Sequence, residues 1–207
     1  MFGIPPHLKL ILYAGSIAEW AQIPELLFTI RAWPEDTCLL LQSRLGMHDP
    51  DYQRSLRHLY QEGRVFWGHK LLSQPELNSL TAAAKCTVAL YRDLGPNNQD
   101  LGMSSGKIMR SIVNGTPILA SRYGGLEFIE KHGLGMLVST PHEIPDAIGN
   151  ILANNAQMRS NCLRFRESEL DFRKYWNRLW EKLQHSQLQT PQGARLTKLR
   201  ELPKNLD

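Results

Sequence analysis

Residues 100–138 read DLGMSSGKIMRSIVNGTPILASRYGGLEFIEKHGLGMLV and carry the clearest alternation of helical and extended patterns in the chain. Apolar residues recur at helical spacing in two segments, and each segment is followed by a short apolar run bounded by glycine or proline. Short buried strands that alternate with helices are typical of βα units around a parallel sheet. In order, the pattern predicts a helix over Lys107–Val113, a turn at Asn114–Gly115, a strand over Pro117–Ala120, a helix over Gly125–Lys131 and a strand over Met136–Ser139.

The same alternation extends in both directions from this stretch. Four further apolar runs predict strands over Leu8–Ala14, Thr37–Gln42, Arg64–Trp67 and Cys86–Tyr91. Helical patterns are found over Ala18–Trp33, Asp51–Glu62, Pro75–Lys85, Ile144–Asn154, Ala156–Arg166 and Glu169–Leu183. We therefore expect an α/β fold, a Rossmann-like three-layer sandwich with a parallel sheet of about six strands and C-terminal helices. Residues 1–184 are predicted to form this domain, and residues 185–207 a polar C-terminal tail.

The composition is that of a globular protein with a modest positive charge. The 207 residues are 42% hydrophobic and carry a formal net charge of +4. Because the Lys and Arg residues are scattered, the charge does not indicate a nucleic-acid binder; it is compatible with an anionic small ligand and with peripheral contact to a membrane surface. The sequence contains no apolar run of ~20 residues, and Cys38, Cys86 and Cys162 lack metal-like spacing. These features predict reduced core cysteines and a cytoplasmic location.

The loops that follow the strands form the candidate site, because ligands of open parallel sheets bind beyond the carboxyl ends of the strands. The strongest signal is Ser104-Ser105-Gly106-Lys107, where hydroxyls, a glycine, an ammonium and the free N–H groups of a helix start would cradle a diphosphate. An ordinary serine N-cap followed by a solvated lysine explains the same residues equally well. The other candidate segments are Gly15-Ser16, Ser43-Arg44, Gly68-His69-Lys70, Arg122–Glu127 and the long loop Arg92–Gly106.

Simpler explanations exist for three of these candidates. Gly124-Gly125 would let a ligand approach the backbone, but turns contain glycine pairs at least as often. The helix dipole favours an acid such as Glu127 in a first helical turn with or without a ligand. His69 could act as a base or stack on a ring, whereas a histidine at a strand end is more often only partly exposed.

Several classes of site are disfavoured by missing motifs. The first strand is followed by AGSIAEWAQ and not by GxGxxG, which argues against a nicotinamide or flavin enzyme. The GKS/T loop of P-loop enzymes and the GxSxG motif of serine hydrolases are absent as well. The histidines are dispersed and CxxC is absent, so no metal site is expected.

The order of features in residues 100–138 resembles the core signature of the donor domains of GT-B glycosyltransferases of the group 1-like kind. In that signature a serine-rich loop and a lysine open a helix, a Gly-x-Pro turn leads into a strand, a glycine pair with an acid follows, and Gly-x-Gly-x-Leu-Val closes the pattern. The upstream segments ILYAGSIAEW and VFWGHKLLSQPELNSLTAAAKCTVALY resemble earlier parts of the same domain. The resemblance therefore covers roughly Leu8–Leu183.

This resemblance implies a C-terminal, nucleotide-sugar-binding domain and suggests roles by position. Gly102 and Arg110 depart from the pattern, because many retaining members have glutamates at these two positions. The usual ribose carboxylate is therefore missing, and two interpretations of Arg110 stay open: a cation that takes over its role, or the mark of a lineage with an altered donor or lost activity. The implied contacts are Ser104, Ser105, Gly106 and Lys107 with the donor diphosphate, Gly15 and Ser16 with phosphate or sugar, Gly68 and His69 with the nucleobase, and Gly124, Gly125 and Glu127 with the sugar or ribose.

The function implied is that of a hexosyltransferase-like glycosyltransferase, whose substrate is a nucleotide-diphosphate sugar and which needs no other cofactor. GT-B enzymes hold the donor between two Rossmann-like domains, and here the first strand begins close to Met1. We therefore expect an N-terminal GT-B domain, in cis or in trans, to bind the unknown acceptor. Two alternatives stay open: a non-catalytic interaction module or pseudo-glycosyltransferase subunit that retains the fold, and an epimerase-like hydrolase that needs no acceptor.

Overall fold

The computed structural model describes residues 2–43, 50–93, 95 and 101–187. Arg44, part of the predicted loop 92–106 and most of the predicted polar tail lie outside these residues. The chain divides into two compact units, residues 1–167 and residues 168–207. The predicted boundary at residue 184 stays a prediction.

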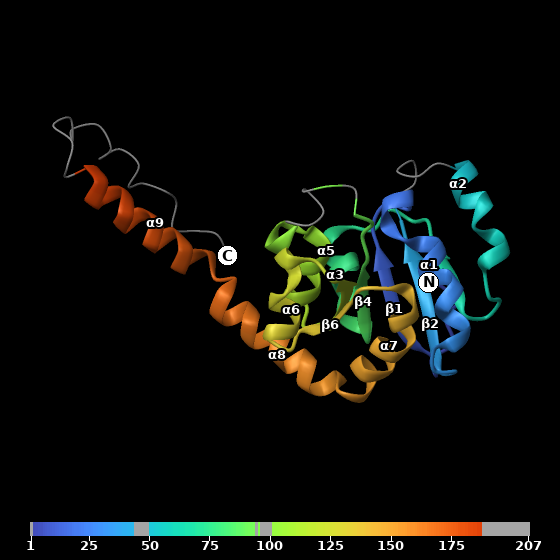
Figure 1. The fold of residues 1–207 in the computed structure, drawn as a ribbon. Helices are drawn as coiled ribbons and strands as arrows, with labels where there is room; N and C mark the ends of the chain where they lie inside the picture. The colour runs from blue at the N-terminus through green and yellow to red at the C-terminus, as the bar shows by residue number, and fades with distance from the viewer. Residues whose placement is uncertain (1, 44–49, 94, 96–100, 188–207) are drawn as a thin grey trace. The chain divides into compact units, whose positions relative to one another are not determined.

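The first unit is built on one six-stranded parallel sheet, as predicted (Figure 1). The strand order is β3-β2-β1-β4-β5-β6. The chain starts at β1 in the middle of the sheet, adds β2 and β3 on one side and then β4, β5 and β6 on the other, so the order of the strands reverses between β1 and β4. This reversal is the place where ligands bind in open α/β sheets, because the loops beyond two neighbouring strands diverge there. The strands are β1 Lys9–Ala14, β2 Thr37–Gln42, β3 Val65–Gly68, β4 Cys86–Ala89, β5 Ile118–Ser121 and β6 Gly135–Val138.

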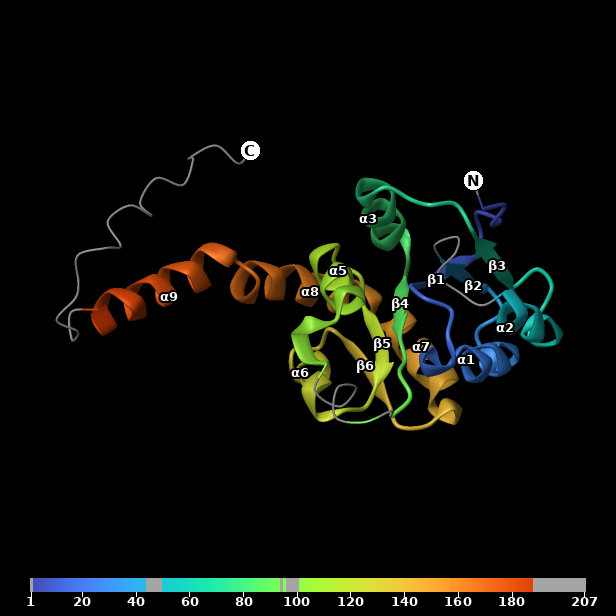
Figure 2. The ribbon, with the colours of Figure 1, turned by 90° about the horizontal axis from the view of Figure 1, so that it is seen from above.

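Helices cover both faces of the sheet, which gives the predicted three layers (Figure 2). Ile11 and Tyr13 of β1 pack in the large core formed with α1 and α7, whereas Leu12 packs in a smaller cluster with Leu80 of α3. This alternation of side chains along a strand explains why the central strands are apolar on both faces. The helices of this unit are α1 Ile23–Thr29, α2 Pro50–Ser55, α3 Gln74–Ala83, α5 Gly106–Val113, α6 Phe128–Lys131, α7 Ile144–Ala153 and α8 Asn155–Glu169, which ends just past the boundary.

The helix predicted over Ala18–Trp33 is interrupted. A 3₁₀ turn, η1 Glu19–Ala21, comes first, and Gln22 then adopts a left-handed conformation with φ of 50° before α1 begins. The Gln22 amide donates a hydrogen bond of 3.0 Å to the carbonyl of Tyr91, a residue distant in the sequence. Apolar periodicity does not reveal such a contact, so the break was not predicted.

Two other predicted helices also divide into shorter pieces. The segment predicted over Asp51–Glu62 forms α2 and then a 3₁₀ turn, η3 Arg57–Leu59. The segment predicted over Gly125–Lys131 begins as the 3₁₀ turn η5 Gly124–Leu126 before α6. Boundaries of this kind depend on tertiary contacts of the terminal turn of a helix. The apolar periodicity of the sequence therefore does not predict them.

The second unit contains one described helix, α9 Phe172–Gln187. Its large apolar side chains recur at helical spacing, and Phe172, Tyr175, Trp176, Leu179 and Leu183 are exposed. Phe172, Trp176 and Trp180 stack successively with ring centroids 6.0 and 6.2 Å apart. No described helix of the chain is both long enough and apolar enough to span a membrane. The three cysteines are free and buried in the first unit, as predicted.

Candidate functional site

The start of α5 lies at the strand-end edge of the sheet, beyond β4. Ser105 is the N-cap residue: its hydroxyl accepts a bond from the N–H of Ile108 at 3.5 Å and lies 2.9 Å from the hydroxyl of Tyr91. Ile108 and Ile112 are fully buried, so the apolar face of α5 is held on the sheet while the start of the helix stays open. The N-terminal end of α5 thus has the geometry that the predicted diphosphate cradle requires, and diphosphate binding there stays a prediction.

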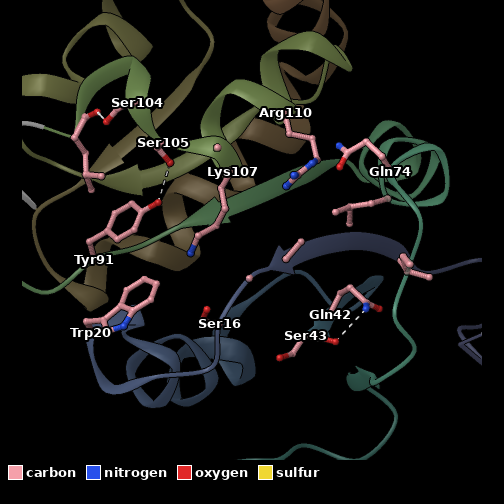
Figure 3. Close-up of a pocket in the computed structure, with 16 residues that line it drawn as sticks. Ser16, Trp20, Gln42, Ser43, Gln74, Tyr91, Ser104, Ser105, Lys107 and Arg110 are labelled. Carbon is pink, nitrogen blue, oxygen red and sulfur yellow. Dashed lines mark hydrogen bonds between the residues drawn. The ribbon is translucent and has the colours of Figure 1, made fainter. Parts of the chain in front are cut away.

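A pocket of ≈ 440 Å³ opens in front of this helix end (Figure 3). It is lined from the ends of β1 and β2, from the segment beyond β3, from Tyr91 beyond β4 and from α5. Among the described residues that line it, the charged side chains are Lys107 and Arg110, and none is a carboxylate. The predicted site residues that the structure brings together here are Gly15, Ser16, Ser43, Ser104, Ser105, Gly106, Lys107 and Arg110.

Lys107 reaches from α5 into a group of aromatic rings. Its Nζ donates a hydrogen bond of 3.1 Å to the Tyr13 hydroxyl and lies 4.4, 4.9 and 5.1 Å from the ring centroids of Tyr13, Tyr91 and Trp20. The rings of Trp20 and Tyr91 are stacked, with centroids 5.9 Å apart and planes 7° from parallel. We call Tyr13, Trp20 and Tyr91 the aromatic cage. The aromatic cage was not predicted from the sequence, although Tyr13 and Tyr91 at or beyond two strand ends are a signal for it.

Burial and the aromatic cage both affect the charge of Lys107. Burial lowers the pKa of Lys107 from 10.5 to about 7. The ring faces attract the ammonium by about 0.5–2 kcal/mol per well-placed cation–π contact. The three ring contacts and burial therefore act on the charge of Lys107 in opposite directions.

Gly15 and Ser16 help to place the lysine. A Cβ at Gly15 would lie 3.2 Å from Cε of Lys107, closer than an ordinary van der Waals contact. The carbonyl of Ser16 accepts a hydrogen bond of 2.5 Å from the Tyr13 hydroxyl, the same hydroxyl that accepts from Lys107. The loop after β1 thus leaves room for the lysine and orients its phenol partner.

Arg110 lies one helical turn after Lys107 and lines the same pocket, where Figure 3 shows it beside Gln74. Gln42 at the end of β2 lines the pocket as well, and its amide donates to the carbonyl of Lys70 at 2.8 Å. The two cations of α5 therefore face one cavity from successive turns. An arrangement of this kind suits a ligand that carries more than one negative charge.

Gly68 and His69 do not line the pocket, although the segment that they open supplies Leu72 and Gln74 to it. A Cβ at Gly68 would lie 2.0 Å from Oε1 of Gln42, so the glycine makes room for a pocket-lining side chain. His69 is exposed and its ring stacks on Trp67 with centroids 5.6 Å apart.

Gly124, Gly125 and Glu127 also lie outside the pocket lining, and the side chain of Glu127 is exposed. Gly125 nevertheless adjoins the turn η4 Gly102–Ser104, because a Cβ at Gly102 would lie 3.4 Å from the Gly125 carbonyl oxygen. The roles predicted for these three residues stay predictions.

Solved structures share this fold. HepE from Anabaena, solved in complex with UDP, matches with a TM-score of 0.69 and 17% identity over 86% of this chain. WaaG, a glycosyltransferase involved in lipopolysaccharide biosynthesis, matches with a TM-score of 0.61 and 16% identity over 81% of this chain. The C-terminal domain of LpcC, a group 1 family glycosyl transferase from Francisella tularensis, matches with a TM-score of 0.62 and 13% identity, over 79% of this chain and 87% of that domain.

These matches confirm the predicted GT-B-type fold. The chain spans 49% of the length of HepE and 45% of the length of WaaG, so it corresponds to about half of each. By sequence, no family model and no curated protein matches the chain.

Proposed function

We propose that this chain binds a nucleotide-diphosphate sugar and serves as the donor-binding part of a glycosyltransferase of hexosyltransferase type. The observation that carries the proposal is the pocket in front of α5, which combines free helix N–H groups with Lys107 and Arg110 and has no carboxylate among its described lining residues. A diphosphate is the part of such a donor that this chemistry recognises. HepE, which shares the fold, has been solved with UDP and with UDP-glucose.

In this proposal the diphosphate binds at Ser104–Lys107, and Gly15 and Ser16 approach the phosphate or the sugar. The nucleobase lies toward the segment that Gly68 and His69 open, because Gln74 on that segment borders the pocket. Glu127, with the glycine pair before it, approaches the sugar or ribose only if the ligand extends beyond the described pocket toward η5.

The chemistry that these residues supply is electrostatic. Negative charge develops on the nucleotide diphosphate as the bond to the sugar breaks, and preorganised N–H groups and cations stabilise it. This role requires neither a covalent intermediate on the protein nor a bound metal. The described residues contain no group of three or more side chains placed to hold a metal ion.

Transfer also requires an acceptor, which we assign to a second domain present in cis or in trans. The support is the length comparison, since HepE and WaaG each have about as much chain again as the part matched here. We infer a cytoplasmic location, and the formal net charge of +4 is compatible with peripheral contact to a membrane surface.

The proposal is tested by calorimetric titration of the full chain with UDP-, GDP- and ADP-sugars. We expect at least one of them to bind, and Lys107→Met to weaken that binding by about 100-fold, the size typical for loss of a charge-assisted contact in a binding site. Lys131→Met is the matched control, because Lys131 is exposed at the end of α6 and does not line the pocket. If none of these sugar nucleotides binds, the proposal that the chain binds a nucleotide-sugar donor is wrong.

The alternative is a non-catalytic interaction module that retains the fold. Arg110 favours it, because a cation stands where the resemblance places a ribose carboxylate. In that case no donor in the panel binds, and a partner domain co-purifies equally well with the original chain and with Lys107→Met.

A further inference from the structure

The helix α9 carries an exposed apolar stripe. Of the ten large apolar residues that are exposed in the described part of the chain, five lie on this one helix. Phe172 is 73% and Leu179 50% exposed, whereas Ile148 and Ile151 of α7 are fully buried. A contiguous exposed apolar surface marks a place where another surface docks. The six side chains of the stripe are spaced alternately three residues and one residue apart, so they share one face of the helix: Phe172, Tyr175, Trp176, Leu179, Trp180 and Leu183.

The positive charge of the chain is concentrated from α9 onward. Lys and Arg occur along the whole sequence, but acids balance them in residues 1–171, which contain 16 Lys and Arg against 17 Asp and Glu. In α9 four cations stand against one carboxylate, a formal net charge of +3 compared with +4 for the entire chain. The surface that docks on α9 is therefore expected to carry negative charge. The charged residues of the helix are Arg173, Lys174, Glu181, Arg178 and Lys182.

The cations border the stripe on both sides. At about 100° per residue, Arg173 lies next to Trp180 at one edge of the stripe, and Lys182 lies next to Tyr175 at the other edge. Glu181 lies on the opposite face of the helix. Long cationic side chains at such edges cover apolar surface with their stems and extend their charged ends into a polar layer.

We propose that α9 binds an anionic membrane surface, with its apolar stripe inserted between the lipid headgroups and its cations against the acidic headgroups. Amphipathic helices that lie in the plane of a membrane interface combine Lys and Arg on the polar face with Trp, Phe and Leu on the other, as α9 does. The inference goes beyond the proposed function and does not rest on it.

Two features favour a membrane over a protein partner. Half of the stripe consists of Tyr175, Trp176 and Trp180, whose rings carry a polar O–H or N–H group, and Tyr and Trp are enriched where an apolar layer meets water. A second copy of α9 would bring its own cations to the edges of the same stripe. Pairing of two copies is therefore disfavoured, because like charges would face each other.

The first test is sedimentation of the full chain with lipid vesicles. We expect the chain to bind vesicles of phosphatidylcholine that contain about 30% phosphatidylglycerol, and to bind vesicles of phosphatidylcholine alone at least about tenfold more weakly. Raising the salt concentration from about 0.1 M to about 1 M should weaken binding to the anionic vesicles, because screening acts on the headgroup contacts.

The second test uses substitutions at exposed positions of α9. Trp176→Ser and Leu179→Gln remove apolar area from the stripe, so each should weaken binding to anionic vesicles by about tenfold or more. Asn177→Ser is the matched control, because Asn177 lies on the polar face of the same turn. Lys182→Gln should weaken this binding by about fivefold, whereas Glu181→Gln should not weaken it. Thermal unfolding of each variant, followed by circular dichroism, checks that the fold is retained.

Three outcomes would overturn the proposal: the full chain fails to bind anionic vesicles, it binds phosphatidylcholine alone equally well, or Trp176→Ser and Leu179→Gln bind as Asn177→Ser does. Sedimentation velocity then identifies what covers the stripe. A dimer that Trp176→Ser converts to a monomer assigns the stripe to a second copy of the chain, and a monomer assigns it to a different protein. Calorimetry with the sugar nucleotides is done without lipid, so it tests the proposed function separately.

Discussion

The ends of β4 and β5 lie side by side in the sheet, and each leads through a 3₁₀ turn with glycine into a helix, yet only the first opens onto the pocket. Beyond β4, Ser105 caps the eight-residue helix α5 with its side chain, and a lysine follows in the first turn. Beyond β5, the turn and the four-residue helix α6 have no side-chain cap bond, and Glu130 follows. The first junction thus presents free N–H groups and a cation, and the second presents carboxylates.

The carboxylate of Glu130 is used inside the protein. It accepts two hydrogen bonds from Arg122, at 2.7 and 2.9 Å, and one of 3.0 Å from the N–H of Leu137. These bonds tie the end of β5 to α6 and β6. A glycine-rich strand end therefore does not open onto a cavity in every case: the junction beyond β4 lines the pocket, whereas the junction beyond β5 is closed by an internal ion pair.

Among substitutions at these two junctions, the largest effect on stability and on donor affinity is expected at Ser105. Ser105→Val removes the cap of α5 and the hydroxyl partner of Tyr91, so we expect the free energy of unfolding to fall by about 1–2 kcal/mol. Donor affinity falls by about tenfold, because the first turn of α5 is no longer held in place. Urea denaturation and calorimetry measure the two effects. Ser105→Thr retains the hydroxyl and serves as control; equal losses in both variants would contradict the role of the cap.

A smaller effect, on stability alone, is expected at the second junction. Arg122→Ala removes the partner of Glu130, and because both side chains are partly exposed we expect a loss of about 1 kcal/mol. Arg122 lowers the pKa of Glu130 below 4.5, so the pair stabilises the protein above that pH and its contribution disappears as the pH falls through the lowered pKa. Urea denaturation at pH 7 and pH 3 should therefore show a difference from the original chain at pH 7 that shrinks at pH 3. A change in donor affinity would show that this junction also contributes to the pocket.

The smallest effect on donor affinity is expected at Glu127, and it tests most directly whether the second junction lies outside the ligand site. Its side chain is exposed outside the pocket lining, so Glu127→Gln should change donor affinity by less than about twofold if the ligand stays within the described pocket. Calorimetry with the sugar nucleotide that binds most tightly measures this change in affinity. A loss of tenfold or more would place the sugar or ribose against η5, as the resemblance implies, and would extend the site across both junctions.

The elements at the centre of the first unit follow from local patterns. The six apolar runs that predict strands all form strands, because a parallel strand covered on both faces must be apolar along its length. The start of α5 was predicted from Ser105, Gly106 and Lys107 because capping depends on residues adjacent in the chain. The breaks in the helix over Ala18–Trp33 were not predicted, since Gln22 is held by the carbonyl of Tyr91.

The sequence by itself determined the α/β class, the six strands and the capped start of α5, because hydrophobic periodicity and helix capping act over a few consecutive residues. Only the tertiary structure decided which strand-end residues share a cavity. It brought Tyr13, Trp20 and Tyr91 around Lys107 and left Gly124, Gly125 and Glu127 outside the pocket lining. The physical reason is that burial and the lowered pKa of Lys107 arise from side chains far apart in the chain, which meet only when the sheet order β3-β2-β1-β4-β5-β6 is formed.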